Sequence, residues 1–237
     1  MNQRLLDAIS SYQPSEETVR YVSEHPSLNI AGPTGAGKDT LATYLTQSGD
    51  YALVVSDTTR SPRPHHDGLE VNGVQYWFLT DDEALAKVTA QKYVEVKQVH
   101  ERGMYGTSTN AYQKVVESRQ IPILVIDIQG IEELMGHFPQ LDAVLLLPPN
   151  FDVWQQRLDG RGDMSHEEKV RRMKTALKEI AKPIENPRFH PVINTEVIDT
   201  AEVIMSGEYK QPAYRDSALL VARELLRRIN DFLANNG

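Results

Sequence analysis

A glycine-rich run that ends in a lysine, Gly32-Pro-Thr-Gly-Ala-Gly-Lys38, restricts the fold of this 237-residue chain more than any other feature. Its spacing is G-x-x-x-x-G-K, and it lies between a short apolar segment and a segment with helical periodicity. Glycines allow the backbone to turn tightly, so that its N–H groups point at phosphate oxygens. The N-terminus of the next helix adds partial positive charge, and Lys38 can reach the terminal phosphates of a nucleotide. The run therefore predicts a phosphate-binding loop, and the alternative is a glycine turn without a ligand.

The residue that follows the lysine departs from the usual form of this loop. A Ser or Thr normally stands there and binds Mg²⁺ through its hydroxyl group, whereas this chain has Asp39. An aspartate oxygen also suits Mg²⁺, although its negative charge would lie close to a phosphate. Thr40, the next residue, can supply a hydroxyl group instead. We therefore expect Mg²⁺ to bind near Asp39 and Thr40.

Composition narrows the class of protein. The chain has no cysteine, which excludes disulfides, zinc–thiolate sites and thiol catalysis. Its net charge of −8 argues against a broad nucleic-acid surface, because such surfaces need clustered positive charge. No apolar run approaches the ~20 residues of a membrane span, and the first residues lack the apolar core of a signal peptide. We therefore expect a cytoplasmic protein, a monomer or a homodimer, that acts on small molecules without a nucleic-acid or membrane partner.

Short apolar runs alternate with segments of helical periodicity along most of the chain. Continuous apolar runs that end in polar residues are typical of strands covered by helices on both faces. We expect buried strands at 27–33, 51–56, 121–127, 142–149 and 190–195. We expect helices at 1–25, 39–49, 81–88, 151–182 with an interruption at 159–163, and 213–233. This alternation predicts an α/β fold with a mostly parallel sheet flanked by helices.

The stretch 57–110 breaks the alternation. Residues 93–100 alternate in polarity as a half-buried strand does. Arg60 and Arg63 stand three residues apart on a segment stiffened by proline, where two guanidinium groups could bind one phosphate dianion. The alternative is a pair of solvated loop arginines. The stretch is therefore interpreted as an inserted mixed α/β segment that binds a substrate.

Several motifs in and after this stretch resemble those of guanylate kinases. Thr58-Thr-Arg-Ser-Pro-Arg-Pro64 resembles the family pattern T-T-R-x-P-R-P, and Glu70-Val-Asn-Gly-Val-Gln-Tyr-Trp-Phe78 resembles E-V-x-G-x-x-Y-x-F. Glu95, the turn Tyr105-Gly-Thr107 and the segment Ile126-Asp-Ile-Gln-Gly130 follow in the family's order. With the glycine loop, the resemblance runs from about residue 28 to 205. It implies a P-loop kinase that moves the γ-phosphoryl group of MgATP to a nucleoside monophosphate, with GMP as the expected acceptor.

The resemblance also implies the residues of the acceptor site. Guanine presents its N1–H and its amine side by side, so an acceptor-only carboxylate can bind both. Glu95 stands at the family position for this role, with Thr107 near guanine O6. Asp127 has three alternatives, which are the Mg²⁺ shell, the guanine amine and a structural cap. The residues implied for GMP binding are Ser56, Arg60, Arg63, Tyr76, Glu95, Tyr105, Thr107 and Asp127.

Two arginine-rich segments resemble the family's lid. They are Arg157-Leu-Asp-Gly-Arg-Gly162 and Arg171-Arg-Met173. Charge spreads over the transferring oxygens during phosphoryl transfer, and arginines can stabilise it. The resemblance gives this role to Arg161 and Arg172, and it places Arg157 at the phosphates or the adenine of ATP. The residues implied for ATP binding are Gly32, Pro33, Thr34, Gly35, Ala36, Gly37, Lys38, Asp39, Thr40, Arg157 and, near adenine, Asn194. Those implied for catalysis are Lys38, Arg60, Arg161 and Arg172.

The resemblance divides the chain into four parts. The first is an N-terminal helical extension, residues 1–26. The acceptor-binding segment is 57–110 and the helical lid is 151–173. The P-loop core combines the remaining segments, which are 27–56, 111–150 and 174–237.

Three features depart from the family pattern, and one of them is a single extra residue between Glu95 and Tyr105. The segment between Arg63 and Tyr76 is longer than usual and includes the adjacent His65 and His66, which we interpret as solvated rather than metal-binding. Val125 stands where the family often has an aspartate. Two alternatives to a guanylate kinase therefore stay open. One is a kinase of the same fold for another nucleotide or a phosphosugar, and the other is a non-catalytic binding module. The sequence does not rank GMP against dGMP.

Overall fold

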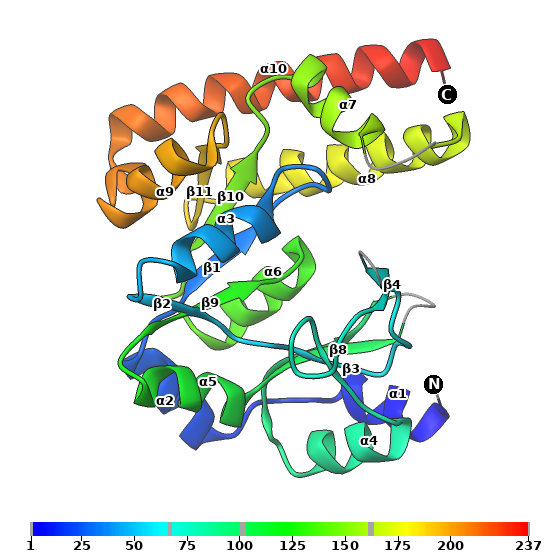
Figure 1. The fold of residues 1–237 in the computed structure, drawn as a ribbon, viewed down its shortest axis with the longest axis vertical. Coiled ribbons are helices and arrows are strands. Elements are labelled where there is room, and N and C mark those ends of the chain that lie inside the picture. The colour runs from blue at the N-terminus through cyan, green and yellow to red at the C-terminus, as the bar shows by residue number, and fades with distance from the viewer. Residues whose placement is uncertain (1, 66–67, 100–102, 161–163, 237) are drawn as a thin grey trace. The chain divides into compact units, whose positions relative to one another are not determined.

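The computed structural model describes residues 2–65, 68–99, 103–160 and 164–236 (Figure 1). Contacts divide the chain into two compact units. The first unit consists of residues 1–27, 49–124 and 132–141, and the second of residues 28–48, 125–131 and 142–237. The predicted extension and the predicted acceptor segment thus belong to the same unit. Arg161 and His66, which the sequence analysis singled out, lie outside the described residues.

A four-stranded mixed sheet forms the centre of the first unit. Its order is β6-β3-β8-β7, and these strands are Trp77–Phe78, Asp57–Thr58, Met104–Ser108 and Tyr93–Gln98. β3 runs parallel to β6 and antiparallel to β8, which is also antiparallel to β7. Two helices flank these strands in the chain, α4 (Asp81–Thr89) and α5 (Thr109–Glu117). The predicted mixed α/β character of the insertion is confirmed.

The first unit also contains two smaller strand pairs. β4 (Pro64–His65) and β5 (Gly68–Leu69) are antiparallel. β2 (Tyr51–Leu53) runs parallel to β9 (Ile121–Val125). The prediction that the segment 51–56 is a buried strand was wrong in part, because β2 is short and its side chains are half-buried or exposed. The physical reason is its place at the end of the strand order, where one edge has no strand beside it.

The two short helices predicted for residues 1–25 are present. α1 (Gln3–Ser10) begins after the N-cap Asn2, and α2 (Glu16–Glu24) begins after the N-cap Ser15. In each case the cap side chain accepts a backbone N–H of the first turn, which stabilises the start of a helix. Apolar side chains of α1 join a buried core with α4, β7 and β8, made of Leu5, Ile9, Tyr12, Ala84, Val88, Tyr93, Val96 and Met104.

The strand β7 differs from its predicted half-buried pattern. Four consecutive side chains, 93 to 96, are buried, and only the last two are partly or fully exposed. A β-bulge between Tyr93 and Glu95 interrupts the strict alternation of faces. Helix α1 also covers this strand, so side chains on both of its faces lose contact with water.

Three parallel strands form the sheet of the second unit. Their order is β11-β10-β1, and they are Phe189–Ile193, Ala143–Leu147 and Leu28–Ala31. Every side chain of β1 and β10 is buried. The helices that follow in this part of the chain are α3 (Lys38–Thr46), α6 (Ile128–His137), α7 (Phe151–Asp159), α8 (His166–Glu185), α9 (Val197–Met205), η2 (Glu208–Lys210) and α10 (Pro212–Asn236). The predicted parallel sheet flanked by helices is confirmed.

The long C-terminal helix packs on its own unit. α10 lies along α8 and also contacts β11 (Figure 1). Its buried side chains recur at helical spacing and are Ala218, Ala222, Leu225 and Ile229. One face of α10 therefore packs on its own unit.

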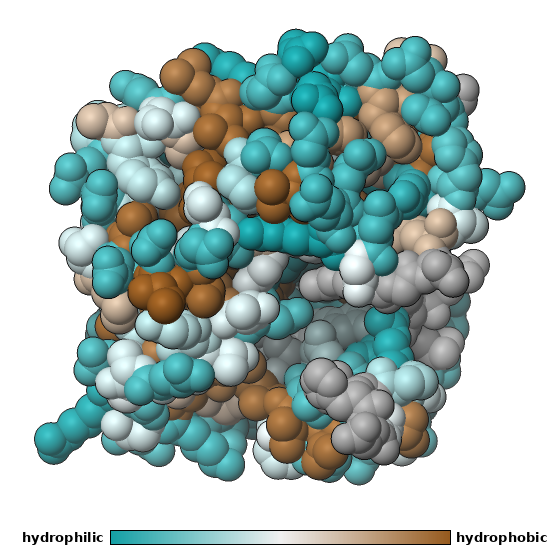
Figure 2. Space-filling model, turned by 45° about the horizontal axis from the view of Figure 1, so that its top comes forward, coloured by the Kyte–Doolittle hydropathy of each residue, from teal (hydrophilic) through white to brown (hydrophobic). Residues whose placement is uncertain are grey.

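The surface is mostly hydrophilic on the face drawn in Figure 2, where hydrophobic side chains gather in several separate patches. Among the described helices, none combines the length and the apolar character that crossing a membrane requires.

Candidate functional site

The glycine loop of the second unit connects β1 to α3, as the sequence predicted. Gly32, Gly35 and Gly37 have φ angles of 144°, 85° and 95°, a region that L side chains rarely adopt. A Cβ atom at Gly32 would lie 2.2 Å from the backbone oxygen of Leu146. Larger residues are therefore excluded here on both conformational and steric grounds, and α3 starts directly after the turn at Lys38.

The side chain of Lys38 folds back over this loop. Its Nζ donates hydrogen bonds to the backbone oxygens of Gly32, at 2.6 Å, and Pro33, at 3.2 Å. The ammonium group therefore lies beside the glycine turn and the N-terminus of α3. A positive group and a helix N-terminus together favour an anion at this position.

Two side chains distant in sequence hold the loop in place. The indole Nε1 of Trp154 donates to the backbone oxygen of Thr34 at 2.8 Å, and Nδ2 of Asn194 donates to that of Ala36 at 2.7 Å. The Asn194 oxygen accepts from the hydroxyl of Thr200 at 3.1 Å. Asn194 is buried and engaged at both ends of its amide, so it supports the loop from within the fold. The sequence analysis missed Trp154, because no local pattern marks a tryptophan that bonds 120 residues away.

The arginines of the predicted lid differ in their surroundings. Arg157 donates through Nη2 to the backbone oxygens of Asn194 and Thr195, both at 3.1 Å. Its Nη1 is buried and has no hydrogen-bond partner among the described residues. Arg172 donates to Glu168 at 2.7 Å, one turn earlier on α8. Arg161 lies outside the described residues.

The predicted metal ligands lie at the start of α3. Asp39 and Thr40 are both exposed in the first turn of this helix. No cluster of three or more His, Cys, Asp or Glu side chains suited to a metal ion occurs within the described ranges. Mg²⁺ commonly keeps several waters and uses one or two protein oxygens together with substrate phosphates. The two residues therefore fit Mg²⁺ that arrives with a nucleotide, rather than a metal site built by the protein alone.

Asp127 lies at the start of α6. Its Oδ1 accepts the backbone N–H of Gly130 at 2.9 Å, and its backbone oxygen accepts the N–H of Ile131 at 3.0 Å. This is the geometry of a helix N-cap. Of the three roles that the sequence left open, the structural cap is thus present.

In the first unit, the guanidinium group of Arg60 forms an ion pair with Glu70. Nη1 and Nη2 of Arg60 donate to the two carboxylate oxygens of Glu70, at 2.6 and 3.0 Å. Nε donates to the hydroxyl of Tyr105 at 2.8 Å, and the ring of Tyr76 lies 5.1 Å from the guanidinium carbon. The sequence correctly grouped Arg60, Tyr76 and Tyr105, although it assigned no role to Glu70.

Arg63 joins the same group through its backbone. Its N–H donates to Oε2 of Glu70 at 2.8 Å, and its side chain is exposed. Hydrogen bonding to Arg60 is the main cause that lowers the pKa of Glu70. Glu70 therefore accepts hydrogen bonds from both arginines of this loop. In the sequence, the position of Glu70 at the start of the E-V-x-G motif was the one feature that indicated a role for this residue.

Glu95 and Thr107 face each other across β7 and β8. The backbone N–H and the hydroxyl of Thr107 both donate to Oε1 of Glu95, at 2.9 and 2.7 Å. Both side chains are buried, and desolvation by burial raises the pKa of Glu95 to about 7. Among the described residues these are the only hydrogen bonds of the carboxylate, so Oε2 can accept from a ligand.

The four-stranded sheet separates this pair from a second group of side chains. Side chains alternate between faces along a strand, so Tyr105 and Thr107 share the face of Glu95. Thr58 pairs with Tyr105, so the side chain of Asp57, one residue earlier, points to the other face. Asp57 pairs directly with Trp77. Asp57 and Trp77 therefore lie on the opposite face. Ser56, predicted near the acceptor, accepts the backbone N–H of Trp77 through its own backbone oxygen.

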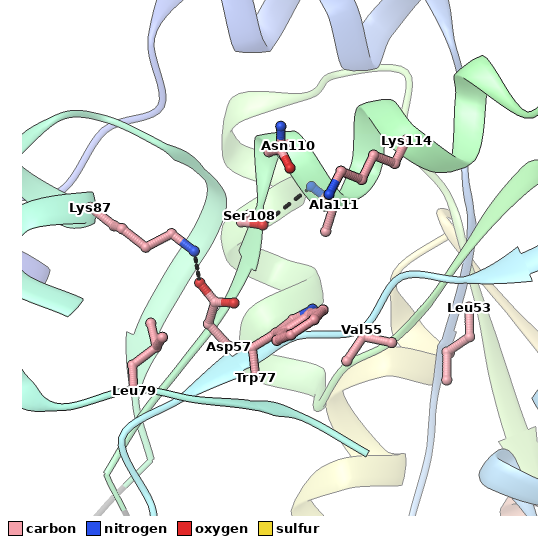
Figure 3. Close-up of a pocket in the computed structure, with 10 residues that line it drawn as sticks. All are labelled: Leu53, Val55, Asp57, Trp77, Leu79, Lys87, Ser108, Asn110, Ala111 and Lys114. Atoms are coloured by element: carbon pink, nitrogen blue, oxygen red, sulfur yellow. Dashed lines mark hydrogen bonds and ion pairs between the residues drawn. The ribbon is translucent and has the colours of Figure 1, made fainter. Parts of the chain in front are cut away.

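A cavity of about 460 Å³ lies on this opposite face (Figure 3). Trp77 and three aliphatic side chains line it, and Lys114 extends into it from α5. Asp57 is buried at its edge and accepts hydrogen bonds from Lys87 and from the hydroxyl of Tyr93. The cavity is thus separate from the Glu95 pair.

Comparison with protein families identifies the chain. The family model described as guanylate kinase matches residues 25–206, which is more than half of the chain. The chain belongs to the guanylate kinase family. The matched region includes every predicted site residue but leaves out both α1 and α2.

Individual relatives agree with the family model. A guanylate kinase of Bifidobacterium longum is 37% identical over 177 residues, covering 73% of this chain and 87% of the relative. The guanylate kinase of Leifsonia xyli subsp. xyli is 35% identical, covering 78% of this chain and 70% of the relative. The human guanylate kinase is 33% identical, covering 73% and 86% respectively.

A solved structure has the same fold. The crystal structure of guanylate kinase from Anaplasma phagocytophilum matches with a TM-score of 0.57, covering 79% of this chain and 88% of that one. The sequence identity is 21%, so this comparison speaks to the fold alone.

Proposed function

We propose that this chain is a guanylate kinase that transfers the γ-phosphoryl group of ATP to GMP and releases ADP and GDP. The observation that carries the proposal is the buried Glu95–Thr107 pair in a chain of the guanylate kinase family. An ionised Glu95 offers Oε2 to the adjacent N–H donors of guanine. A base without these donors would leave the buried carboxylate unpaired, and this costs binding energy.

ATP binds at the glycine loop in this proposal. The loop N–H groups, the N-terminus of α3 and Lys38 surround the phosphates. Arg157 offers the buried Nη1 as a further donor to ATP. Asn194 acts through the loop, because its amide is bonded to Ala36 and Thr200.

Mg²⁺ bound with ATP would neutralise charge that develops on the phosphates. Asp39 and Thr40 would hold it, because they are exposed oxygen donors at the start of α3. The negative charge of Asp39 makes the metal contact more important here than in a loop with Ser or Thr, since without Mg²⁺ it would repel the nucleotide.

The GMP phosphate binds at Arg60, Arg63 and Tyr76. Glu70 holds the guanidinium group of Arg60 in a two-bond ion pair. A phosphate dianion would compete with Glu70 for the same donors. Glu70 thus orients Arg60 beside the proposed phosphate position.

The reaction needs no side-chain base. The attacking oxygen of the GMP phosphate is already anionic, so the protein's contribution is positioning and stabilisation of charge. Lys38, Arg60, Arg161 and Arg172 are the residues we assign to this task. For Arg172, contact with the transferring group requires release of Glu168.

The test is an ADP-release assay with MgATP and a panel of monophosphates, namely GMP, dGMP, AMP, CMP, UMP and dTMP. Turnover confined to guanine nucleotides is expected, and the ratio of GMP to dGMP settles the preference for the sugar. Turnover with another base only would overturn the role of Glu95 and favour the kinase with a different acceptor. Folded protein that binds ATP and phosphorylates none of them would overturn the proposal. The cytoplasmic location and the oligomeric state stay predictions.

A further inference from the structure

The N-terminal helices lie outside the family match but inside the acceptor unit. The match starts at residue 25, after α1 and α2 have ended. Leu5 and Ile9 of α1, together with Tyr12 between α1 and α2, are buried in the core formed with α4, β7 and β8. This core lies directly beneath the strand that carries Glu95. The extension is therefore part of the support of the acceptor site.

Tyr12, which follows α1, makes the most specific contact. Its hydroxyl donates to the backbone oxygen of Tyr93 at 2.5 Å and accepts the backbone N–H of the same residue at 2.9 Å. β7 is the last strand in its sheet, so one of its edges has no strand beside it. Buried backbone groups at such an edge need another partner. A single hydroxyl supplies both hydrogen bonds here.

The position held by Tyr12 decides which way Glu95 points. The register of β7 against β8 shifts between Tyr93 and Glu95, which is a β-bulge. Bulges re-aim side chains, and a slip of one residue would move a side chain to the other face of the sheet. The other face holds Asp57, to which the hydroxyl of Tyr93 is bonded at 2.7 Å. Tyr93 is thus fixed by its backbone and by its side chain, and Glu95 follows it on the opposite face.

Further contacts attach the extension on both sides of Tyr12. The backbone N–H of Asn2 donates to Asp81 of α4 at 2.6 Å. The side chain of Gln91 donates to the backbone oxygen of Gln13 at 3.1 Å. Figure 1 shows α1 beside α4, in agreement with the contacts between these helices. The segment that carries Tyr12 is therefore bonded to the rest of the first unit on both sides of this residue.

We infer that Tyr12 is a positioning residue for guanine recognition, which it serves by holding the bulge of β7 that presents Glu95 to the acceptor. This inference rests on the proposed GMP kinase activity. It makes the extension a specificity element of this chain rather than a passive addition.

The test compares two matched variants, Tyr12→Phe and Tyr112→Phe. Both tyrosines are buried in the first unit, and both hydroxyls donate to a backbone oxygen. Tyr112 bonds to His25 at the end of α2 and does not contact β7 through this group. The measured quantities are KM for GMP, KM for ATP, kcat, the preference for GMP over AMP, and the melting temperature.

Tyr12→Phe is expected to raise KM for GMP roughly tenfold, because the backbone N–H and C=O of Tyr93 both lose their hydrogen bond to the hydroxyl. It should also reduce the preference for GMP over AMP. KM for ATP should not change. Tyr112→Phe should lower the melting temperature without raising KM for GMP. If both variants raise it equally, or neither does, the positioning role is wrong while the GMP kinase stands. Wild-type protein without GMP turnover would overturn both.

Amide hydrogen exchange of the wild-type protein decides the matter if Tyr12→Phe does not fold. The Tyr93 amide, although on an edge strand, is expected to exchange slowly because Tyr12 accepts it. Binding of GMP, but not of ATP, should slow the exchange of the Tyr93 and Glu95 amides further. Exchange of the Tyr93 amide at the rate of an unstructured peptide, or no response to GMP, would overturn the inference.

Discussion

The two proposed nucleotide-binding regions of this chain are built in different ways. The donor region is a continuous loop of backbone groups, Gly32 to Lys38, between a buried strand and a helix. The acceptor region combines side chains from 56 to 107, which lie on short strands and loops. The conformation of this loop follows mainly from its own glycines, and Trp154 and Asn194 support it through its backbone. Side chains on short strands depend on every element that holds those strands, including α1 and α2.

Because of this difference, substitutions in the two regions should have different effects on ATP and GMP. Changes in the donor region should affect ATP and catalysis while the acceptor affinity stays constant. Changes in the acceptor region should affect GMP alone. The four predictions that follow change one region at a time, from the largest expected effect to the smallest.

The largest effect is expected for Lys38→Ala. Its ammonium group lies beside the loop and has no substitute there, so turnover should fall by roughly 10³-fold. Circular dichroism and the melting temperature should stay close to those of the wild type. Lys174→Ala, an exposed change on α8, is the control. Near-normal turnover of Lys38→Ala would contradict the donor site.

The second effect concerns the pH dependence of folding. Burial raises the pKa of Glu95 to about 7, above its ordinary value of 4.5. The folded state therefore binds this proton more tightly than the unfolded state does. The contribution of Glu95 to the free energy of unfolding is fully present below pH 4.5 and is lost as the pH rises through 7. Relative to Glu95→Gln, the wild-type free energy of unfolding should fall on the order of 3 kcal/mol between pH 4.5 and 8. Urea titrations measure it.

Glu24→Gln, an exposed change on α2, should follow the wild type in the same titrations. A constant difference between Glu95→Gln and the wild type at all pH values would show that Glu95 does not titrate in this range. Its role as an ionisable reader of guanine would then have to be revised.

A smaller effect is expected for Arg60→Lys. Lysine keeps the charge but cannot form the two-bond fork, so a phosphate loses one strong hydrogen bond. The value of kcat/KM for GMP should fall roughly 30-fold, while KM for ATP stays constant. Arg20→Lys on the exposed side of α2 is the control. A parallel rise in KM for ATP would break the separation of the two regions.

The smallest effect is expected for Trp154→Phe. The variant loses the hydrogen bond to the backbone of Thr34, and KM for ATP should rise a few-fold, or about 1 kcal/mol. KM for GMP should not change. Trp77→Phe is the matched control, because Trp77 lies on the face of the acceptor sheet away from Glu95. A larger effect of Trp77→Phe on KM for ATP would refute the assignment of Trp154 to the loop.

Local patterns predicted much of the fold. Strands β9 and β10 are continuous apolar runs, and β1 and β11 are apolar apart from Asn29 and His190. The helices show clear periodicity and caps. The ion pair of Arg172 with Glu168 spans one helical turn and could also have been read from the sequence. The burial of β7 could not, because the cover comes from α1, some 80 residues earlier in the chain.

The sequence by itself determined the glycine loop between β1 and α3, and its motifs predicted the acceptor residues. Glycines and a lysine at fixed spacing act through the backbone, whose geometry is local, and the acceptor motifs are contiguous. Only the tertiary structure decided the pairing of Arg60 with Glu70, the support of the loop by Trp154 and the hold of Tyr12 on β7. Trp154 and Tyr12 bond to segments far away in the chain, and the pairing of Arg60 with Glu70 depends on how the loop between them folds. Such contacts depend on packing, which no short window of sequence contains.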